Sequence, residues 1–160
     1  MALQFPDTTT AGPLSWGLTL TQTFLILFVM SVIEGGTILI VDPWQQLAST
    51  RNAERMNDVN EIANAFYMDF ADHRGTFSCA SGPVPIELSW IQSSGGYNLA
   101  PCLVPDYLVQ FPHDPGDAGA YYRSVKDYWS GYRIMLNIAT MRLVVTAPSA
   151  ELGATIQVER

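Results

Sequence analysis

The stretch that decides the fold is SWGLTLTQTFLILFVMSVIEGG, residues 15–36, which opens an apolar segment five residues longer. Fourteen of the residues in 18–41 are Leu, Ile, Phe or Val. Gln22 near the start and Glu34 before a Gly pair are the most polar residues in it. At about 1.5 Å per residue, a helix of this length reaches across a bilayer core. We therefore expect a hydrophobic transmembrane or assembly helix over residues 18–42.

The apolar side chains of this segment favour membrane insertion by roughly 4–8 kcal/mol, against a cost on the order of 3 kcal/mol for an acid at mid-membrane. A buried core helix of a soluble protein is one alternative, although such helices rarely exceed 20 residues or are apolar on every side. A cleaved secretory signal is another, but such signals begin with positive charge. Here the first seventeen residues contain Asp7 and no Lys or Arg.

The overall composition argues against nucleic-acid binding. The 160 residues carry a formal charge of −7 and a single lysine, Lys126, whereas binding to phosphate needs clustered cations. Charged residues make up 14% of the chain, below the usual quarter for soluble domains. We infer that much of the surface faces lipid or protein.

The segment after the apolar stretch predicts an amphipathic helix over residues 43–75. Asp42 can cap it, Pro43 fits its first position, and Gly75 is a suitable stop. Apolar residues recur at three- and four-residue steps and form one stripe, made by Val59, Ile62, Phe66 and Phe70. With the preceding segment, this helix is expected to form one long N-terminal helix.

The remainder, residues 76–160, is expected to form a globular head. Its first part, 76–119, is rich in Pro and Gly and predicts turns, with one helical turn in VPDYLVQF. Later segments either alternate apolar and polar residues or are rich in β-branched and aromatic residues. They therefore predict strands over residues 120–125, 130–139, 142–147 and 154–158. In the second of these, Tyr132, Ile134, Leu136 and Ile138 are expected on the covered face. The fold class is therefore α+β, a long N-terminal helix packed on a small antiparallel sheet.

Cys79 and Cys102 bracket the irregular loop. Outside the cytoplasm they would pair and stabilise the domain by about 3 kcal/mol, and in a reducing compartment they would remain two thiols.

Catalytic motifs are lacking in the sequence. His73 and His113 do not belong to a metal-binding pattern, and the chain has no phosphate-binding Gly-rich loop. Asp114 and Asp117 could supply part of a weak Ca²⁺ site, although Asp-Pro-Gly-Asp more often forms a turn. The aromatic residues of the head could line a ligand surface, with core packing the alternative. We expect no enzyme, no cofactor and no metal.

The residues GLTLTQ resemble the processing motif of type IV pilins and pseudopilins. The resemblance implies that a prepilin peptidase removes the leader, residues 1–17, by cutting between Gly17 and Leu18, and then methylates the new N-terminus. Gln22 stands where that family usually has a Glu that pairs with a neighbouring subunit. The resemblance therefore implies an assembly role for Gln22, and Glu34 is a further candidate for pairing between subunits.

Three downstream segments are similar to the family's patterns in the same order. They are residues 42–77, residues 104–115 (VPDYLVQFPHDP) and residues 131–140 (GYRIMLNIAT). The likeness runs from Gly17 to about Ile138.

The leading hypothesis is a structural subunit of a type IV pilus-like filament. It implies partnership with other copies of this chain, other pilins and the peptidase, and passage from the cytoplasmic membrane to the cell surface. The alternatives are a pseudopilin of a type II secretion system, a non-polymerising membrane-anchored binding module, and a small extracytoplasmic enzyme that uses Asp114 and Asp117.

Overall fold

The computed structural model describes residues 19–40 and 42–160, and side chains at 19–33 and 42–160. The chain divides into two compact units, Met1–Asp42 and Pro43–Arg160. In the first unit, α1 spans Leu20–Ile40. The described side chains of α1 end at Ile33. In the part of the chain that the structure describes, no helix is long and apolar enough to cross a membrane.

The second unit begins with α2, Pro43–Asp72. The expectation of one continuous helix is therefore wrong, because α1 ends at Ile40 and a second helix starts at Pro43. A proline cannot donate an N–H to the preceding turn, and it disfavours helical geometry in the residue before it. Proline fits the first turn of a new helix, which is where Pro43 lies.

The C-terminus of α2 confirms the predicted stop near Gly75. The Gly75 N–H donates to the Phe70 carbonyl at 2.7 Å and the Arg74 N–H to the Ala71 carbonyl at 3.2 Å. Arg74 and Gly75 both have positive φ, 57° and 83°. These paired bonds form a Schellman motif, which satisfies carbonyls that the ending helix leaves free.

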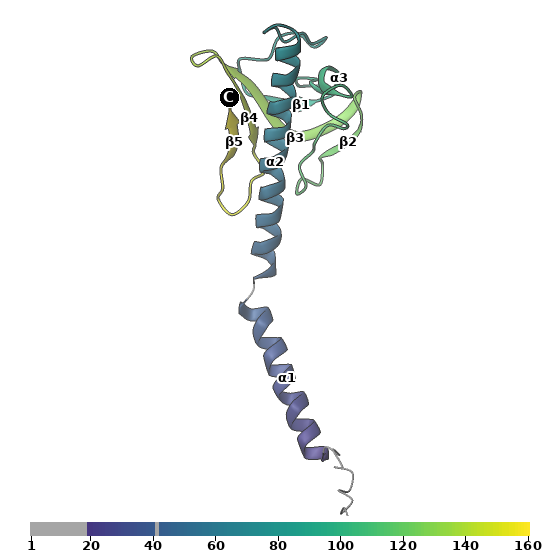
Figure 1. The fold of residues 1–160 in the computed structure, drawn as a ribbon, viewed down its shortest axis with the longest axis vertical. Helices are drawn as coiled ribbons and strands as arrows, with labels where there is room; N and C mark the ends of the chain where they lie inside the picture. The colour runs from purple at the N-terminus through teal and green to yellow at the C-terminus, as the bar shows by residue number, and fades with distance from the viewer. Residues whose placement is uncertain (1–18, 41) are drawn as a thin grey trace, which may run out of the picture. The chain divides into compact units, whose positions relative to one another are not determined.

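The sheet of the second unit is antiparallel throughout (Figure 1). Its strands are β1 (Ser89–Gln92), β2 (Tyr121–Ser124), β3 (Asp127–Asn137), β4 (Arg142–Ala147) and β5 (Ile156–Glu159). The order is β1-β3-β4-β5, and β2 pairs with the first part of β3. The antiparallel α+β class is thus as expected, and the four predicted strand segments correspond to β2 to β5.

Two features of residues 76–119 differ from expectation. The four-residue strand β1 lies within the stretch that was expected to form mostly turns and short elements, and no strand was predicted at these residues because four residues show too little periodicity. The short helix α3, Ala100–Leu103, lies just before VPDYLVQF rather than in it, with Pro101 in its first turn. Proline is well tolerated there because its N–H would lack a helical partner.

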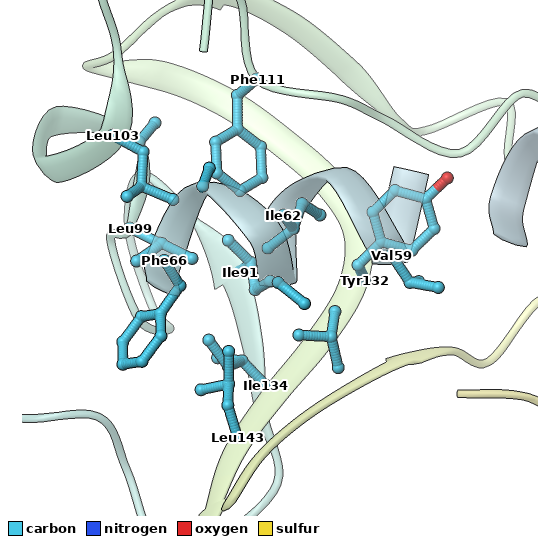
Figure 2. Packing of buried hydrophobic residues seen from close by; sticks show 14 of the residues in the cluster. Val59, Ile62, Phe66, Ile91, Leu99, Leu103, Phe111, Tyr132, Ile134 and Leu143 are labelled. Atoms are coloured by element: carbon cyan, nitrogen blue, oxygen red, sulfur yellow. The ribbon is translucent and has the colours of Figure 1, made fainter. Parts of the chain in front are cut away.

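The core lies between α2 and the sheet (Figure 2). Val59, Ile62 and Phe66 of the predicted stripe are buried against strand residues such as Ile134 and Leu143. Phe70 is 37% exposed and lines the rim of an apolar pocket of about 280 Å³.

Ile138 corrects the expected covered face of β3. Its side chain is 64% exposed because the strand ends at Asn137 and Ile138 already belongs to the turn. Tyr132 and Ile134 are fully buried, as the alternation predicted.

Candidate functional site

The start of α1 explains one of its polar residues. The Thr19 N–H donates to Gln22 Oε1 at 3.0 Å, and the Gln22 N–H approaches Thr19 Oγ1 at 3.4 Å. This reciprocal pair is a capping box, which satisfies N–H groups that a helix start leaves free. The sequence signal for this capping box is T-x-x-Q, residues 19–22. The sequence analysis missed it because Gln22 was considered only as the position where pilins usually have a Glu. The other predicted processing and assembly residues, Gly17, Leu18 and Glu34, lie outside the described residues or side chains.

Beyond its cap, α1 presents large apolar side chains to solvent. From Leu20 to Ile33 ten such side chains are 46–78% exposed. Burying each of them is worth about 1.5–3 kcal/mol. A contiguous apolar surface of this kind marks an interaction surface.

The two cysteines form a disulfide, the first of the two alternatives that the sequence left open. Cys79 and Cys102 are joined across 23 positions, with their Cα atoms 5.4 Å apart. The bond ties the loop after α2 to α3.

A buried ion pair joins α2 to the loop before β2. Arg55 donates from Nε and Nη2 to the two carboxylate oxygens of Asp114, at 2.8 and 2.9 Å. Both side chains are at most 1% exposed. Asp114 also accepts from the Gly116 and Asp117 N–H groups at 2.8 and 3.0 Å. Asp114 is therefore the anchor of this loop, and its oxygens are engaged in fixing structure.

A second carboxylate extends the ion pair to the C-terminal turn. Glu151 accepts from Arg51 Nε at 2.7 Å and from Arg55 Nη1 at 2.9 Å. Hydrogen bonds from Arg51 and then Arg55 lower the pKa of Glu151 to about 2. The Asp114 hydrogen bonds raise the pKa of Arg55. We call Arg51, Arg55, Asp114 and Glu151 the arginine network.

Gly116 is required where the arginine network meets the loop. A Cβ on this residue would overlap the Arg55 guanidinium. Glycine lets the backbone approach the buried cation closely, and a larger residue would displace one of the two.

A separate hydrogen bond links α2 to β3. The Tyr132 hydroxyl donates to Asp58 Oδ2 at 2.6 Å. Burial is the main reason that the pKa values of both groups are raised. The contact keeps a buried phenol and a half-buried carboxylate satisfied.

The three segments that resemble pilin patterns thus meet through their polar residues. Arg55 and Asp58 come from residues 42–77, Asp114 from residues 104–115, and Tyr132 from residues 131–140. Sequence reasoning did not single out Arg55 or Glu151. The signal available was a pair of arginines four positions apart, the only basic residues between Pro43 and Asp72.

The arrangement offers little for catalysis or metal binding. The described residues contain no group of three or more His, Cys, Asp or Glu side chains that could hold a metal ion. Asp117 is partly occupied as well, since its Oδ1 accepts from the Gly119 N–H at 2.8 Å. Of the two acids in the enzyme hypothesis, Asp114 is a structural acceptor through both carboxylate oxygens, and Asp117 is one through Oδ1.

Comparison with protein-family models, curated proteins and solved structures gives no significant match to this chain.

Proposed function

We propose that this chain is a structural subunit of a type IV pilus-like filament. It polymerises through its hydrophobic N-terminal segment after removal of the leader, residues 1–17. The observation that carries the proposal is the solvent-exposed apolar surface of α1, which belongs to a unit separate from the folded head. A helix apolar on all sides suits a bilayer first and a bundle of identical helices afterwards.

The capping box supports the same proposal. A cut between Gly17 and Leu18 leaves Thr19 and Gln22 in the mature chain, so α1 keeps its N-terminal hydrogen bonds after processing. Gln22 can also hydrogen-bond to a neighbouring subunit, without the charge that a Glu would supply. In this proposal residues 18–42 mediate assembly, and the second unit, which begins with α2, is the folded head.

The arrangement of the head supports the proposal too. In a filament, the segments of the head must remain fixed to one another and to α2 while α1 is buried among copies of itself. The arginine network and the disulfide both tie segments of the head together, and the network does so directly to α2. Before assembly the chain would be held in the cytoplasmic membrane, with its head on the outer side, where a disulfide persists.

The first test is processing. In cells that express a prepilin peptidase, the wild-type chain should lose residues 1–17, and intact-mass spectrometry should show a methylated Leu18. Gly17→Ala should leave the chain full length. Gly12→Ala, a matched change within the leader, should be processed normally. A wild-type chain that keeps its original N-terminus would contradict the proposal.

The second test is assembly. Electron microscopy of sheared cell-surface material should show helical filaments that contain the mature chain. Phe28→Asp, at a position 66% exposed on α1, should abolish them, because a charge buried in a helix bundle is costly. Ser31→Ala on the same helix should not. Short periplasmic assemblies would instead indicate a type II secretion pseudopilin.

The alternative is a membrane-anchored binding module that does not polymerise. The exposed Tyr121 and the half-buried Trp90 and Trp129 on the sheet favour it. A processed chain found only as a monomer in the membrane fraction would support it over the filament.

A further inference from the structure

One face of the sheet carries aromatic side chains from β1, β2 and β3 that do not belong to the core. Trp129 lies directly opposite Gln92 of β1 and Tyr121 of β2. Directly opposed residues of antiparallel strands share a face of the sheet. The neighbouring Tyr128 points to the other face and is buried in the core. Trp129, Gln92 and Tyr121 therefore face away from the core.

These residues line a hollow of about 390 Å³. Its other walls include the loop after β1, with Ser94, and the loop before β2, with Asp117. This volume lies within the range of about 300–1,000 Å³ that is typical of small-molecule sites.

Several polar groups at this hollow have unused hydrogen-bonding capacity. Within the described part of the chain, no hydrogen bond joins the Gln92 side-chain amide or the Ser94 hydroxyl to another protein group. Asp117 Oδ2 receives only a long bond of 3.4 Å, from Trp129 Nε1. The hollow thus offers an amide, a hydroxyl and a carboxylate oxygen beside an indole ring.

The Trp129 indole packs against a second indole, that of Trp90. The Trp90 ring lies 4.9 Å from the Trp129 ring, and the Arg133 guanidinium lies 3.9 Å from the Trp90 ring centre. On the other side, Tyr121 is fixed by its hydrogen bond to Asp127 at 2.8 Å. A platform held in this way loses little side-chain entropy when a ligand binds.

We propose that this hollow, lined by Gln92, Ser94, Asp117, Tyr121 and Trp129, binds a neutral saccharide. A sugar ring has an apolar C–H face, which packs on an aromatic ring, and a rim of hydroxyls, each able to donate and accept. The carboxylate of Asp117 disfavours an acidic sugar. A proline-rich peptide fits less well because grooves for such peptides are lined mainly by aromatic and apolar side chains.

The test is a titration of the full chain, labelled with ¹⁵N, in a zwitterionic detergent that has no sugar headgroup. The probes are cellobiose, maltose and lactose. At least one of them should shift the indole N–H signal of Trp129 saturably and leave that of Trp44 unchanged. Trp44 is 78% exposed and lies outside the hollow, so Trp44→Phe is the matched control and should bind the sugar as well as wild type.

Two variants make the test specific. Gln92→Ala should weaken binding by about tenfold, the effect of one hydrogen bond, with the unfolding midpoint retained. Trp129→Ala should abolish it, which is read from the backbone amide signals of Gln92 and Ser94 because this variant lacks the indole. The proposal is overturned by any of three results: no saturable shift up to about 50 mM sugar, unchanged affinity in Gln92→Ala, or a Trp129 shift caused by decaproline and not by the sugars.

The saccharide site does not depend on filament assembly, because all of its residues belong to the folded head. A chain that is not processed and forms no filaments would leave this titration unaffected, so the two proposals fail separately.

Discussion

At the residue scale, the arginine network is the most consequential feature of the head. Taking Arg55 and Asp114 out of water is costly, and their mutual bonds, the loop N–H groups and the Arg55 bonds to Glu151 and Asn52 offset that cost. A buried ion pair adds little net stability compared with apolar residues of similar volume. Removing one of its two members is strongly destabilising, because the other charge is then buried without a partner. It fixes which loop conformation packs against α2.

We therefore expect Arg55→Met to lower the free energy of unfolding by about 3–5 kcal/mol, because it leaves Asp114 buried without a counter-charge. Asp114→Asn in the same chain should recover part of the loss, since an amide can still accept from the Gly116 and Asp117 N–H groups. Urea unfolding measures both.

The control for this prediction is the exposed pair of Arg123 and Asp127, 3.4 Å apart. Arg123→Met should change stability by less than about 1 kcal/mol. If Arg55→Met costs no more than this control, the arginine network has no special role.

Glu151 gives the arginine network a pH dependence. Its pKa is lower in the folded chain, about 2 against 4.5. A carboxylate with a depressed pKa contributes stability above its unfolded value, and this contribution is lost as the pH falls through the folded value. We expect Glu151→Gln to destabilise the chain at pH 6, and the difference from wild type to shrink between pH 4.5 and 2. A difference that stays constant over this range would contradict the assignment.

At the element scale, the disulfide and the Schellman motif determine how the chain leaves α2. The helix ends at Asp72, and the loop that follows is tied to α3 through Cys79 and Cys102. The loop is rich in Pro and Gly and has few regular hydrogen bonds of its own, so the covalent bond limits its freedom.

Reduction of the disulfide should lower the free energy of unfolding by about 3 kcal/mol in the chain-entropy model. The paired variant Cys79→Ala with Cys102→Ala should show a similar loss and no further response to reductant. Thermal unfolding with and without dithiothreitol measures both. Equal stability of the oxidised and reduced chains would show that the loop is held by packing alone.

At the scale of the whole molecule, the division after Asp42 separates an apolar helix from a head with its own core. The head contains α2, all five strands and the arginine network. We expect a truncated chain of residues 43–160 to fold cooperatively and remain monomeric, because the large apolar surface of α1 is gone. Urea unfolding and size-exclusion chromatography check this. Loss of cooperative unfolding would show that the head depends on α1.

The sequence by itself determined the features that depend on near neighbours. The apolar stripe of α2, the stop near Gly75 and the segments of β2 to β5 follow from side-chain periodicity and from backbone sterics within a few residues. The sequence did not predict β1, because a strand of four residues shows too little periodicity. Ile138 was misassigned because alternation does not reveal where a strand ends.

Only the tertiary structure decided which distant polar groups meet. Arg55 finds Asp114 59 positions away and Glu151 96 positions away, and Trp129 finds Gln92 on a strand that the sequence did not reveal. These contacts follow from the packing of α2 on the sheet and from strand register, which depend on the whole core rather than on any local pattern.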